Sequence, residues 1–188
     1  MKDFTRKNDK NYTQMPGTGV VLKSHPSVVV QGEINELICH LAVALESIST
    51  QFVYLSDLFY IQKGLIEIKK QLAQSPPDKP KIDWDMVAKL EDGIVAMETA
   101  MEIYHFSEDD IPTYPTQIHL ARAVCQRAER SVVAWHQYED EHNKDRYYYD
   151  EEEDQDNRFM YVVSYLNRLG DYLLSLAKYT KMTKLGVR

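Results

Sequence analysis

Residues 118–130 read IHLARAVCQRAER, and residues 165–173 read YLNRLGDYL. In each stretch the apolar residues recur every three or four positions, which is the period of an α-helix that buries one face. Charged and amide side chains stand beside both apolar stripes. Because arginines are grouped along one edge of the first stripe, the two helices together form a candidate site for an anion.

The helical period extends over most of the chain. It predicts helices over residues 28–49, 50–74, 83–104, 115–142 and 157–180. Proline-rich or densely charged segments separate them, and Asp83 is expected to cap the third helix. The predicted fold is therefore all-α: a single-domain five-helix bundle with an up-down core over residues 28–188, preceded by an irregular N-terminal loop segment over residues 1–27.

Charge and cysteine content restrict the partners and the compartment. The net charge of -7 argues against nucleic acid or an anionic membrane as a partner. No apolar run approaches the roughly 20 residues of a membrane span. Cys39 and Cys125 both fall in predicted helices, which favours a reduced, cytoplasmic chain over a disulfide scaffold. An anionic ligand must therefore be bound by a local cluster of Arg and Lys.

Polar side chains at helical spacing define the candidate site. On the fourth predicted helix, the residues that share a face are Arg122, Gln126 and either Glu129 or Arg130. On the fifth, Asn167 and Asp171 lie one turn apart, beside Arg168. The alternative interpretation is a solvated flank whose ion pairs each contribute about 0.3–0.5 kcal/mol. The six histidines show no ligand spacing for zinc, and the acidic run at residues 150–156 is interpreted as a solvated loop, so no protein-bound metal site is predicted.

The N-terminal segment is basic and rich in turn-forming residues. Residues 5–13 read TRKNDKNYT, a composition that can wrap a phosphate chain through backbone N–H groups, hydroxyls and cations. The alternative interpretation is a disordered basic tail.

Separated motifs, in order along the chain, carry a family resemblance. A motif reading Tyr-Thr-Arg-Thr-Gly-Asp-Lys-Gly-Thr-Thr aligns with residues 4–13, and Tyr-Gly-Thr-Val-Asp-Glu-Leu aligns with residues ending at Leu37. Ala-Arg-x-x-x-Arg-Arg-Ala-Glu-Arg aligns with residues 121–130, and Leu-Asn-Arg-Leu-Ser-Asp-x-Leu-Phe with residues 166–174. Over its whole length the chain resembles the ATP:cob(I)alamin (corrinoid) adenosyltransferase family, whose members form trimeric five-helix bundles.

The resemblance implies an activity and its cofactors. Members of the family transfer the 5′-deoxyadenosyl group of ATP to the cobalt of reduced cobalamin, and triphosphate leaves. ATP, Mg²⁺ and the corrinoid substrate are thus the expected ligands, and a corrinoid-dependent enzyme is an expected acceptor of the product. In the family the ATP site lies between subunits of a homotrimer, where the N-terminal loop of one subunit closes over the arginine-bearing helix of its neighbour, and the resemblance implies the same arrangement here.

The resemblance also implies roles for single residues. The ATP loop would contain Thr5, Arg6, Asp9, Lys10 and Thr13, with Lys23 nearby. The residues that would face the nucleotide and triphosphate are Arg122, Glu129, Arg130 and Asn167. Phe106 matches the aromatic residue that displaces the lower ligand of the corrinoid, and Asp171 matches a position that supports the corrinoid. At the position of Asn35 the family has an Asp that pairs with the Arg aligned here with Arg122, so Asn35 and Arg122 are the candidate catalytic pair.

The ATP-site motifs depart from the family at several positions, and this leaves alternatives open. The departures are Asn8, Asn11, Gly19, Val20, Asn35 and Gln126. Gln126 stands in place of a phosphate-binding Arg, and an amide can form a hydrogen bond but cannot neutralise a phosphate. An active adenosyltransferase is the primary hypothesis. The alternatives are a degenerate relative that binds nucleotide or corrinoid as a sensor or delivery protein without turnover, and a purely structural helical protein.

Overall fold

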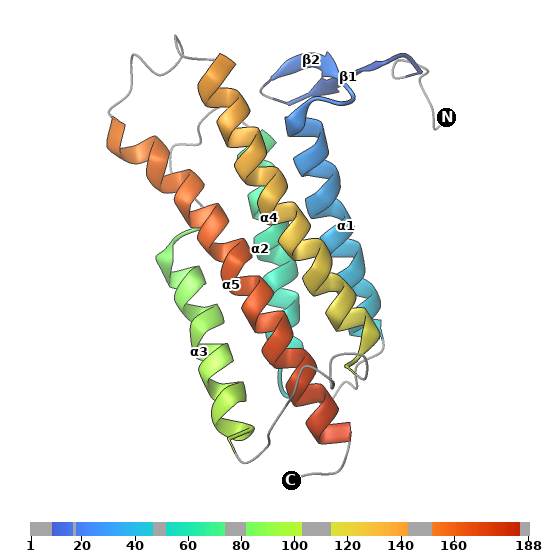
Figure 1. The fold of residues 1–188 in the computed structure, drawn as a ribbon, viewed down its shortest axis with the longest axis vertical. Coiled ribbons are helices and arrows are strands. Elements are labelled where there is room, and N and C mark those ends of the chain that lie inside the picture. The colour runs from blue at the N-terminus through green and yellow to red at the C-terminus, as the bar shows by residue number, and fades with distance from the viewer. Residues whose placement is uncertain are drawn as a thin grey trace.

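The computed structural model describes residues 9–16, 18–46, 52–73, 82–102, 114–142 and 152–184. The helices are α1 (Pro26–Glu46), α2 (Leu55–Ala73), α3 (Trp84–Ala100), α4 (Thr116–His142) and α5 (Glu152–Lys184). Successive helices run in opposite directions along the long axis of the molecule (Figure 1). The predicted all-α five-helix bundle is confirmed.

The core is built where α4 meets α1 on one side and α5 on the other, while α3 packs on α5 and α2 on α1. The predicted apolar stripe of α4 consists of Ile118, Ala121, Cys125, Ala128, Val132 and Trp135. All are buried except Trp135, which is half-buried. The stripe of α5 is buried at Val162, Leu166, Leu169, Leu173 and Leu176. Because these stripes face inward, the polar residues beside them are fixed along the edges of the two helices.

The predicted start of α3 agrees with the structure, whereas the predicted start of α5 does not. Asp83 caps α3 as expected, since its side chain accepts a hydrogen bond from the backbone N–H of Met86 at 3.0 Å. Helix α5 begins at Glu152, earlier than predicted, and so includes part of the acidic run that was interpreted as a loop. Glu is a good helix former, so the acidic residues of this segment are compatible with a helix.

The N-terminal segment contains a hairpin that the sequence pattern does not predict. Strands β1 (Tyr12–Met15) and β2 (Gly19–Leu22) pair antiparallel, with Tyr12 opposite Leu22 and Met15 opposite Gly19. Gly19 has φ of 90°, a conformation that glycine adopts without strain, and it ends the turn. Strands of four residues are too short for an alternating pattern to be recognised.

The hairpin is tied to the bundle at the start of α1 and the end of α4, where Figure 1 shows it. The backbone N–H of His25 donates to the carbonyl of Leu22 at 2.9 Å, directly before α1 begins. The ring of His25 meets the ring of Tyr138 on α4 edge to face, with centroids 4.9 Å apart. The hairpin therefore has a fixed attachment to the helix that carries most of the candidate site.

Helix α1 is apolar over a longer stretch than expected from the sequence. Among the described residues it is the one helix long and apolar enough to cross a membrane by length and composition alone. The core helix of a soluble protein meets the same criterion, and α1 buries Val30, Ile34, Leu37 and Leu41 inside the bundle. We therefore assign its apolar character to the core.

A glycine on α2 sets how closely that helix approaches α5. A Cβ atom on Gly64 would lie 2.7 Å from the hydroxyl oxygen of Tyr165 and 3.1 Å from Cε of Met86. Any larger residue would push against the fully buried Tyr165 ring. The absence of a side chain at Gly64 therefore leaves room for the Tyr165 hydroxyl beside α2.

Candidate functional site

An open groove of about 410 Å³ runs along one face of α4. Its lining residues are Gln126, Glu129, Arg130, Val133, Ala134 and Gln137. Their spacing of three and four places them on one side of the helix. The groove combines a cation, a carboxylate and two amides with a short apolar floor, a set that suits a ligand with both an anionic and an apolar part.

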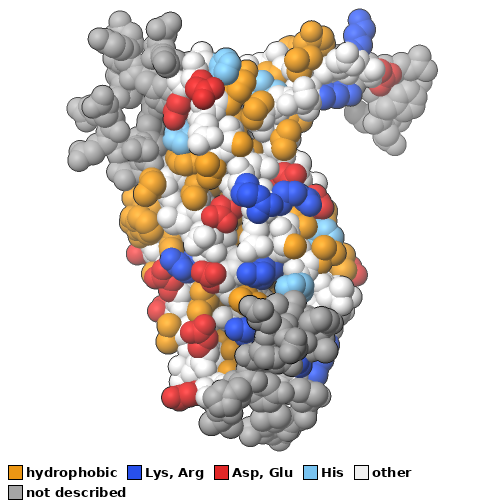
Figure 2. All heavy atoms as spheres, in the orientation of Figure 1, with side chains coloured by type: hydrophobic (Ala, Val, Ile, Leu, Met, Phe, Trp, Pro, Cys, Tyr) orange, Lys and Arg blue, Asp and Glu red, His pale blue; other side chains and the backbone are white. Residues whose placement is uncertain are grey.

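Basic side chains gather on the same face of the molecule. Figure 2 shows Lys and Arg at mid-height over α4 and α1, with acidic side chains beside them. The protein is acidic overall, and on this face the basic side chains alternate with carboxylates.

Two of the predicted site residues meet across the α4–α5 seam. The side-chain amide of Asn167 donates a hydrogen bond to Oε1 of Glu129 at 3.2 Å. This contact orients the carboxylate of Glu129, which also lines the groove beside Arg130. The structure therefore brings Glu129, Arg130 and Asn167 to one place, although they lie far apart in the sequence.

Arg122 and Asp171 lie near the same seam, around the buried Cys125. The thiol of Cys125 donates to the carbonyl of Leu166 at 3.2 Å. Burial raises the pKa of this thiol well above its usual range, and the carboxylates of Glu129 and Asp171 raise it further, while Arg122 opposes them. Cys125 is thus a protonated core residue, and the charges that act on it mark how closely the predicted site residues surround it.

Asp171 is linked to α3 through Arg168 of its own helix. Its carboxylate accepts a hydrogen bond from Arg168 at 2.9 Å, and Arg168 also pairs with Glu91 of α3 at 3.0 Å. Asp171 therefore belongs to a surface ion network, one turn along α5 from Asn167. Its carboxylate is separate from the groove lining on α4.

Asn35 lies on another side of the bundle. Its side-chain oxygen accepts a hydrogen bond from Nζ of Lys69 on α2 at 3.0 Å. The Nε of Arg122 on α4 is buried and has no hydrogen-bond partner among the described residues. Among the described residues, the two members of the expected catalytic pair are therefore not joined.

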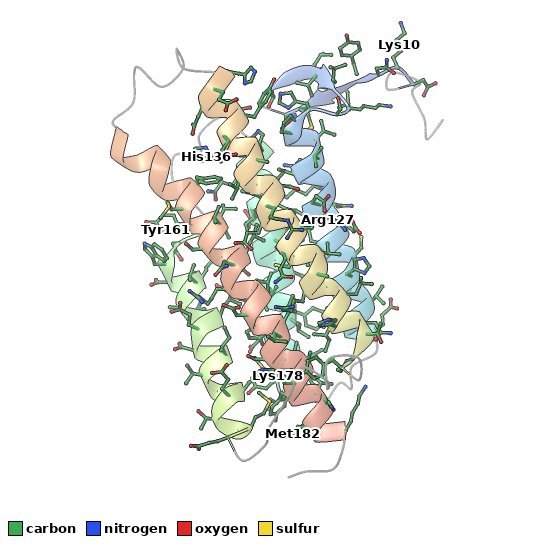
Figure 3. The ribbon with its side chains drawn as sticks, in the orientation of Figure 1. Lys10, Arg127, His136, Tyr161, Lys178 and Met182 are labelled. Atoms are coloured by element: carbon green, nitrogen blue, oxygen red, sulfur yellow. The ribbon has the colours of Figure 1, made fainter. Side chains whose placement is uncertain are left out.

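The N-terminal candidates surround the hairpin. Asp9 and Lys10 are exposed before β1, Thr13 is half-buried within β1, and Lys23 follows β2, where its backbone N–H donates to the carbonyl of Asn11 at 2.8 Å. Figure 3 shows Lys10 at the far end of the N-terminal arm, away from Arg127 on α4. Thr5, Arg6 and Phe106 lie outside the described residues.

Sequence reasoning missed two parts of this surface. Val133, Ala134 and Gln137 extend the groove, and their helical spacing from Arg130 was a signal that could have placed them. Arg127 binds Glu33 and Glu36 of α1. No sequence spacing could reveal that contact, because it joins residues more than 90 positions apart.

Metal-ligating side chains do not cluster in the described part of the chain. No group of three or more His, Cys, Asp or Glu residues there could hold a metal ion. A cation at the groove would have to be bound largely by its ligand, with Glu129 as the carboxylate at hand.

Comparison with known proteins identifies the family. The family model described as cobalamin adenosyltransferase matches residues 4–180. A corrinoid adenosyltransferase of Bacillus subtilis is 27% identical over an alignment of 189 positions, which covers 95% of this chain and 86% of that protein. A cobalamin adenosyltransferase of Cupriavidus metallidurans is 26% identical over 178 residues, 94% of this chain and 86% of that protein.

Solved structures share the fold. One is a variant PduO-type ATP:corrinoid adenosyltransferase from Lactobacillus reuteri complexed with cobalamin and ATP, with a TM-score of 0.72, 24% identity, and coverage of 98% of this chain and 96% of that chain. A second variant, complexed with ATP, gives a TM-score of 0.68 at 23% identity and covers 97% and 95%. With a family model matched over residues 4–180, a five-helix bundle of the same fold, and a polar groove on α4, this chain belongs to the cobalamin adenosyltransferase family.

Proposed function

We propose that this protein is an ATP:corrinoid adenosyltransferase. Cobalt(I) of a reduced corrinoid donates an electron pair to the ribose C5′ of ATP, and a cobalt–carbon bond forms. The bond between C5′ and oxygen breaks, triphosphate leaves with the electron pair, and cobalt becomes formally cobalt(III). The family match over residues 4–180 is the observation that carries this proposal. The groove beside the Asn167–Glu129 contact supports it.

Such a reaction needs no covalent nucleophile from the protein, so its residues bind, orient and neutralise. Arg130 is the cation that would meet the triphosphate in the groove, and Gln126 would contribute an amide donor. Glu129, oriented by Asn167, would accept hydrogen bonds from the nucleotide. Mg²⁺ binds proteins mainly through substrate phosphates and one or two carboxylates, so it would arrive on the triphosphate, with Glu129 as its carboxylate.

We assign the remaining wall of the ATP site to a neighbouring subunit of a homotrimer. In this division residues 1–27 are the nucleotide-binding segment and residues 28–188 the helical bundle. The loop residues assigned to ATP are Thr5, Arg6, Asp9, Lys10, Thr13 and Lys23. Two observations support a shared site: the groove is lined by α4 alone, and Lys10 lies far from it in its own subunit (Figure 3).

The outer face of the hairpin also supports association with a second copy. Tyr12, Val20 and Leu22 lie on one face of the two-stranded sheet and are 53%, 68% and 47% exposed. A two-stranded hairpin is marginally stable alone and gains from covering such a face. Arg122, whose Nε is buried without a partner among the described residues, is assigned a partner across the same interface at Asn35.

The corrinoid is assigned to the side of the site that holds Phe106 and Asp171. Phe106 would displace the lower axial ligand of cobalt, and Asp171, fixed by Arg168, would support the corrinoid. We also propose a cytoplasmic location and a corrinoid-dependent enzyme as the acceptor of the product.

An anaerobic titration tests the proposed function. Chemically reduced cobalamin and MgATP are added to the protein, and the corrinoid spectrum is followed. Formation of light-sensitive adenosylcobalamin supports the enzyme. Binding of ATP or corrinoid without a new cobalt–carbon bond would overturn it in favour of a sensor or delivery protein, and no binding would leave a structural role.

A mixing experiment tests the shared site. Lys10→Met and Arg130→Met variants are purified separately, then unfolded and refolded together. If the loop and the groove come from different subunits, mixed trimers contain unmodified sites and recover activity, whereas each variant alone stays weak. No recovery, or a monomer by sedimentation, would contradict the shared site.

A further inference from the structure

The groove face of α4 lies between two lateral contacts. On one side the Asn167–Glu129 hydrogen bond joins α4 to α5. On the other side the side chain of Arg127 extends from α4 toward α1, as labelled in Figure 3. The direction of Glu129 and Arg130 therefore depends on how both contacts hold the helix.

The contact to α1 is a fork. Nε of Arg127 donates to Oε2 of Glu33, and a terminal guanidinium nitrogen donates to Oε2 of Glu36. The two acids are three positions apart, so they share one face of α1. A planar guanidinium that satisfies two carboxylates at once fixes both distance and orientation, which a single ammonium cannot do. Glu36 also pairs with His40 at 3.6 Å.

The fork also determines which positive charges are available to bind an anionic ligand. The pKa of Arg127 is raised chiefly by its hydrogen bonds to Glu36 and Glu33, and the pKa of Glu36 is lowered chiefly by the bond from Arg127. Its positive charge is thus balanced by α1. Among the residues that line the groove, Arg130 is then the cation, and it stands next to Glu129.

We propose that Arg127 is a positioning residue of the nucleotide site, which sets the rotation of α4 against α1 and does not itself bind the triphosphate. The inference rests on the proposed adenosyltransferase function. A guanidinium about 8 Å from a helix axis moves by more than 1 Å when the helix turns by about 10°, and displacements of about 1 Å at a reactive site carry large kinetic costs.

Calorimetric binding of MgATP and of inorganic triphosphate tests the proposal. The variants are Arg127→Met, the double variant Glu33→Gln with Glu36→Gln, and the triple combination. Because each removes the same fork, each should raise Kd about tenfold, and the triple variant also about tenfold instead of a hundredfold. The matched control is Lys70→Met, which removes an exposed cation paired with Glu67 on α2 and should leave Kd unchanged.

Direct binding of triphosphate by Arg127 would change the affinities of the variants in a different way. If Arg127 binds triphosphate, Glu33 and Glu36 compete with the ligand for it, so the double Gln variant would bind triphosphate more tightly while Arg127→Met binds it more weakly. Salt provides a second readout that loss of structure alone would not change. Arg127→Met should keep the salt dependence of triphosphate binding, whereas Arg130→Met should reduce it. A reduced salt dependence in Arg127→Met would overturn the proposal.

Binding by the parent protein distinguishes a failure of the proposed function from a failure of the Arg127 proposal. If the parent protein binds neither MgATP nor triphosphate, the function is wrong, and with it the assignment of Arg127 to a nucleotide site. The fork itself is then judged by thermal unfolding. Arg127→Met and the double Gln variant should each lower Tm by about 2–4 °C, and the triple variant no further. Additive losses would show that the three residues do not act together.

Discussion

Two buried tyrosines on α5 predict opposite responses to the same chemical change. Tyr165 and Tyr172 lie two turns apart and are 0% and 1% exposed. The hydroxyl of Tyr165 is buried against Gly64 and has no hydrogen-bond partner among the described residues. The hydroxyl of Tyr172 donates to Oδ2 of Asp57 on α2 at 3.2 Å. Replacing each by Phe therefore removes an unsatisfied group in one case and a hydrogen bond in the other.

The expected magnitudes follow from these environments. A buried hydroxyl without a partner costs roughly 1–3 kcal/mol, so Tyr165→Phe should raise the free energy of unfolding by about 1 kcal/mol after the small void is counted. Tyr172→Phe leaves Asp57 without this donor and should lower it by about 1–2 kcal/mol. For a protein of this size, 1 kcal/mol corresponds to a Tm shift of about 2–4 °C.

Thermal and urea unfolding at equal protein concentration measure the difference, because association makes Tm depend on concentration. Tyr161→Phe, in a half-buried ring that packs on Trp84, is the control and should change stability by less than about 0.5 kcal/mol. Equal destabilisation by Tyr165→Phe and Tyr172→Phe would refute the reasoning. Gly64→Ala adds a further check: its Cβ would meet the Tyr165 hydroxyl, so Tyr165→Phe should partly rescue it.

Three further predictions concern the α4 surface. Asn167→Asp sets a second carboxylate against Glu129 and should weaken MgATP binding about three- to tenfold by calorimetry, whereas unchanged affinity would exclude a role for this contact. Arg130→Met should raise the Kd of MgATP about tenfold with Tm nearly unchanged, and equal affinity would remove Arg130 from the site. The hydrogen bond from Arg127 lowers the pKa of Glu36 from its usual 4.5. The contribution of this carboxylate to stability is therefore present above pH 4.5 and is lost as the pH falls through the lower pKa of the folded state. In urea unfolding, the stability of Glu36→Gln should differ from that of the parent at pH 7 and converge with it in acid, and a constant difference would contradict this.

The helical parts of the fold could be predicted because their apolar period is long. The stripes of α4 and α5 repeat over several turns, and the residues placed on them are buried in the structure. The hairpin could not be predicted in the same way, because strands of four residues give no recognisable alternation. Its register depends on contacts with the bundle, such as His25 against Tyr138, which sequence spacing does not reveal.

The candidate site likewise contains features that sequence spacing could predict and features that depend on packing. Helical spacing placed Arg122, Gln126 and either Glu129 or Arg130 on one face of α4, but it could not show that Glu129 meets Asn167 of α5. The two-helix site at residues 118–130 and 165–173 stays a prediction. The fork of Arg127 with Glu33 and Glu36 was out of reach, because it depends on how α4 lies against α1. Long-range ion pairs follow from packing, and packing is decided by the apolar faces of both helices together.

The reaction products test the central claim most directly. The protein is incubated anaerobically with cob(I)alamin and MgATP, and adenosylcobalamin and all phosphate products are quantified in the same sample. Transfer of the 5′-deoxyadenosyl group predicts one triphosphate for each adenosylcobalamin formed, with no ADP above the level of a protein-free control. Release of ADP and phosphate, or consumption of neither substrate, would contradict the assignment of this protein as an adenosyltransferase.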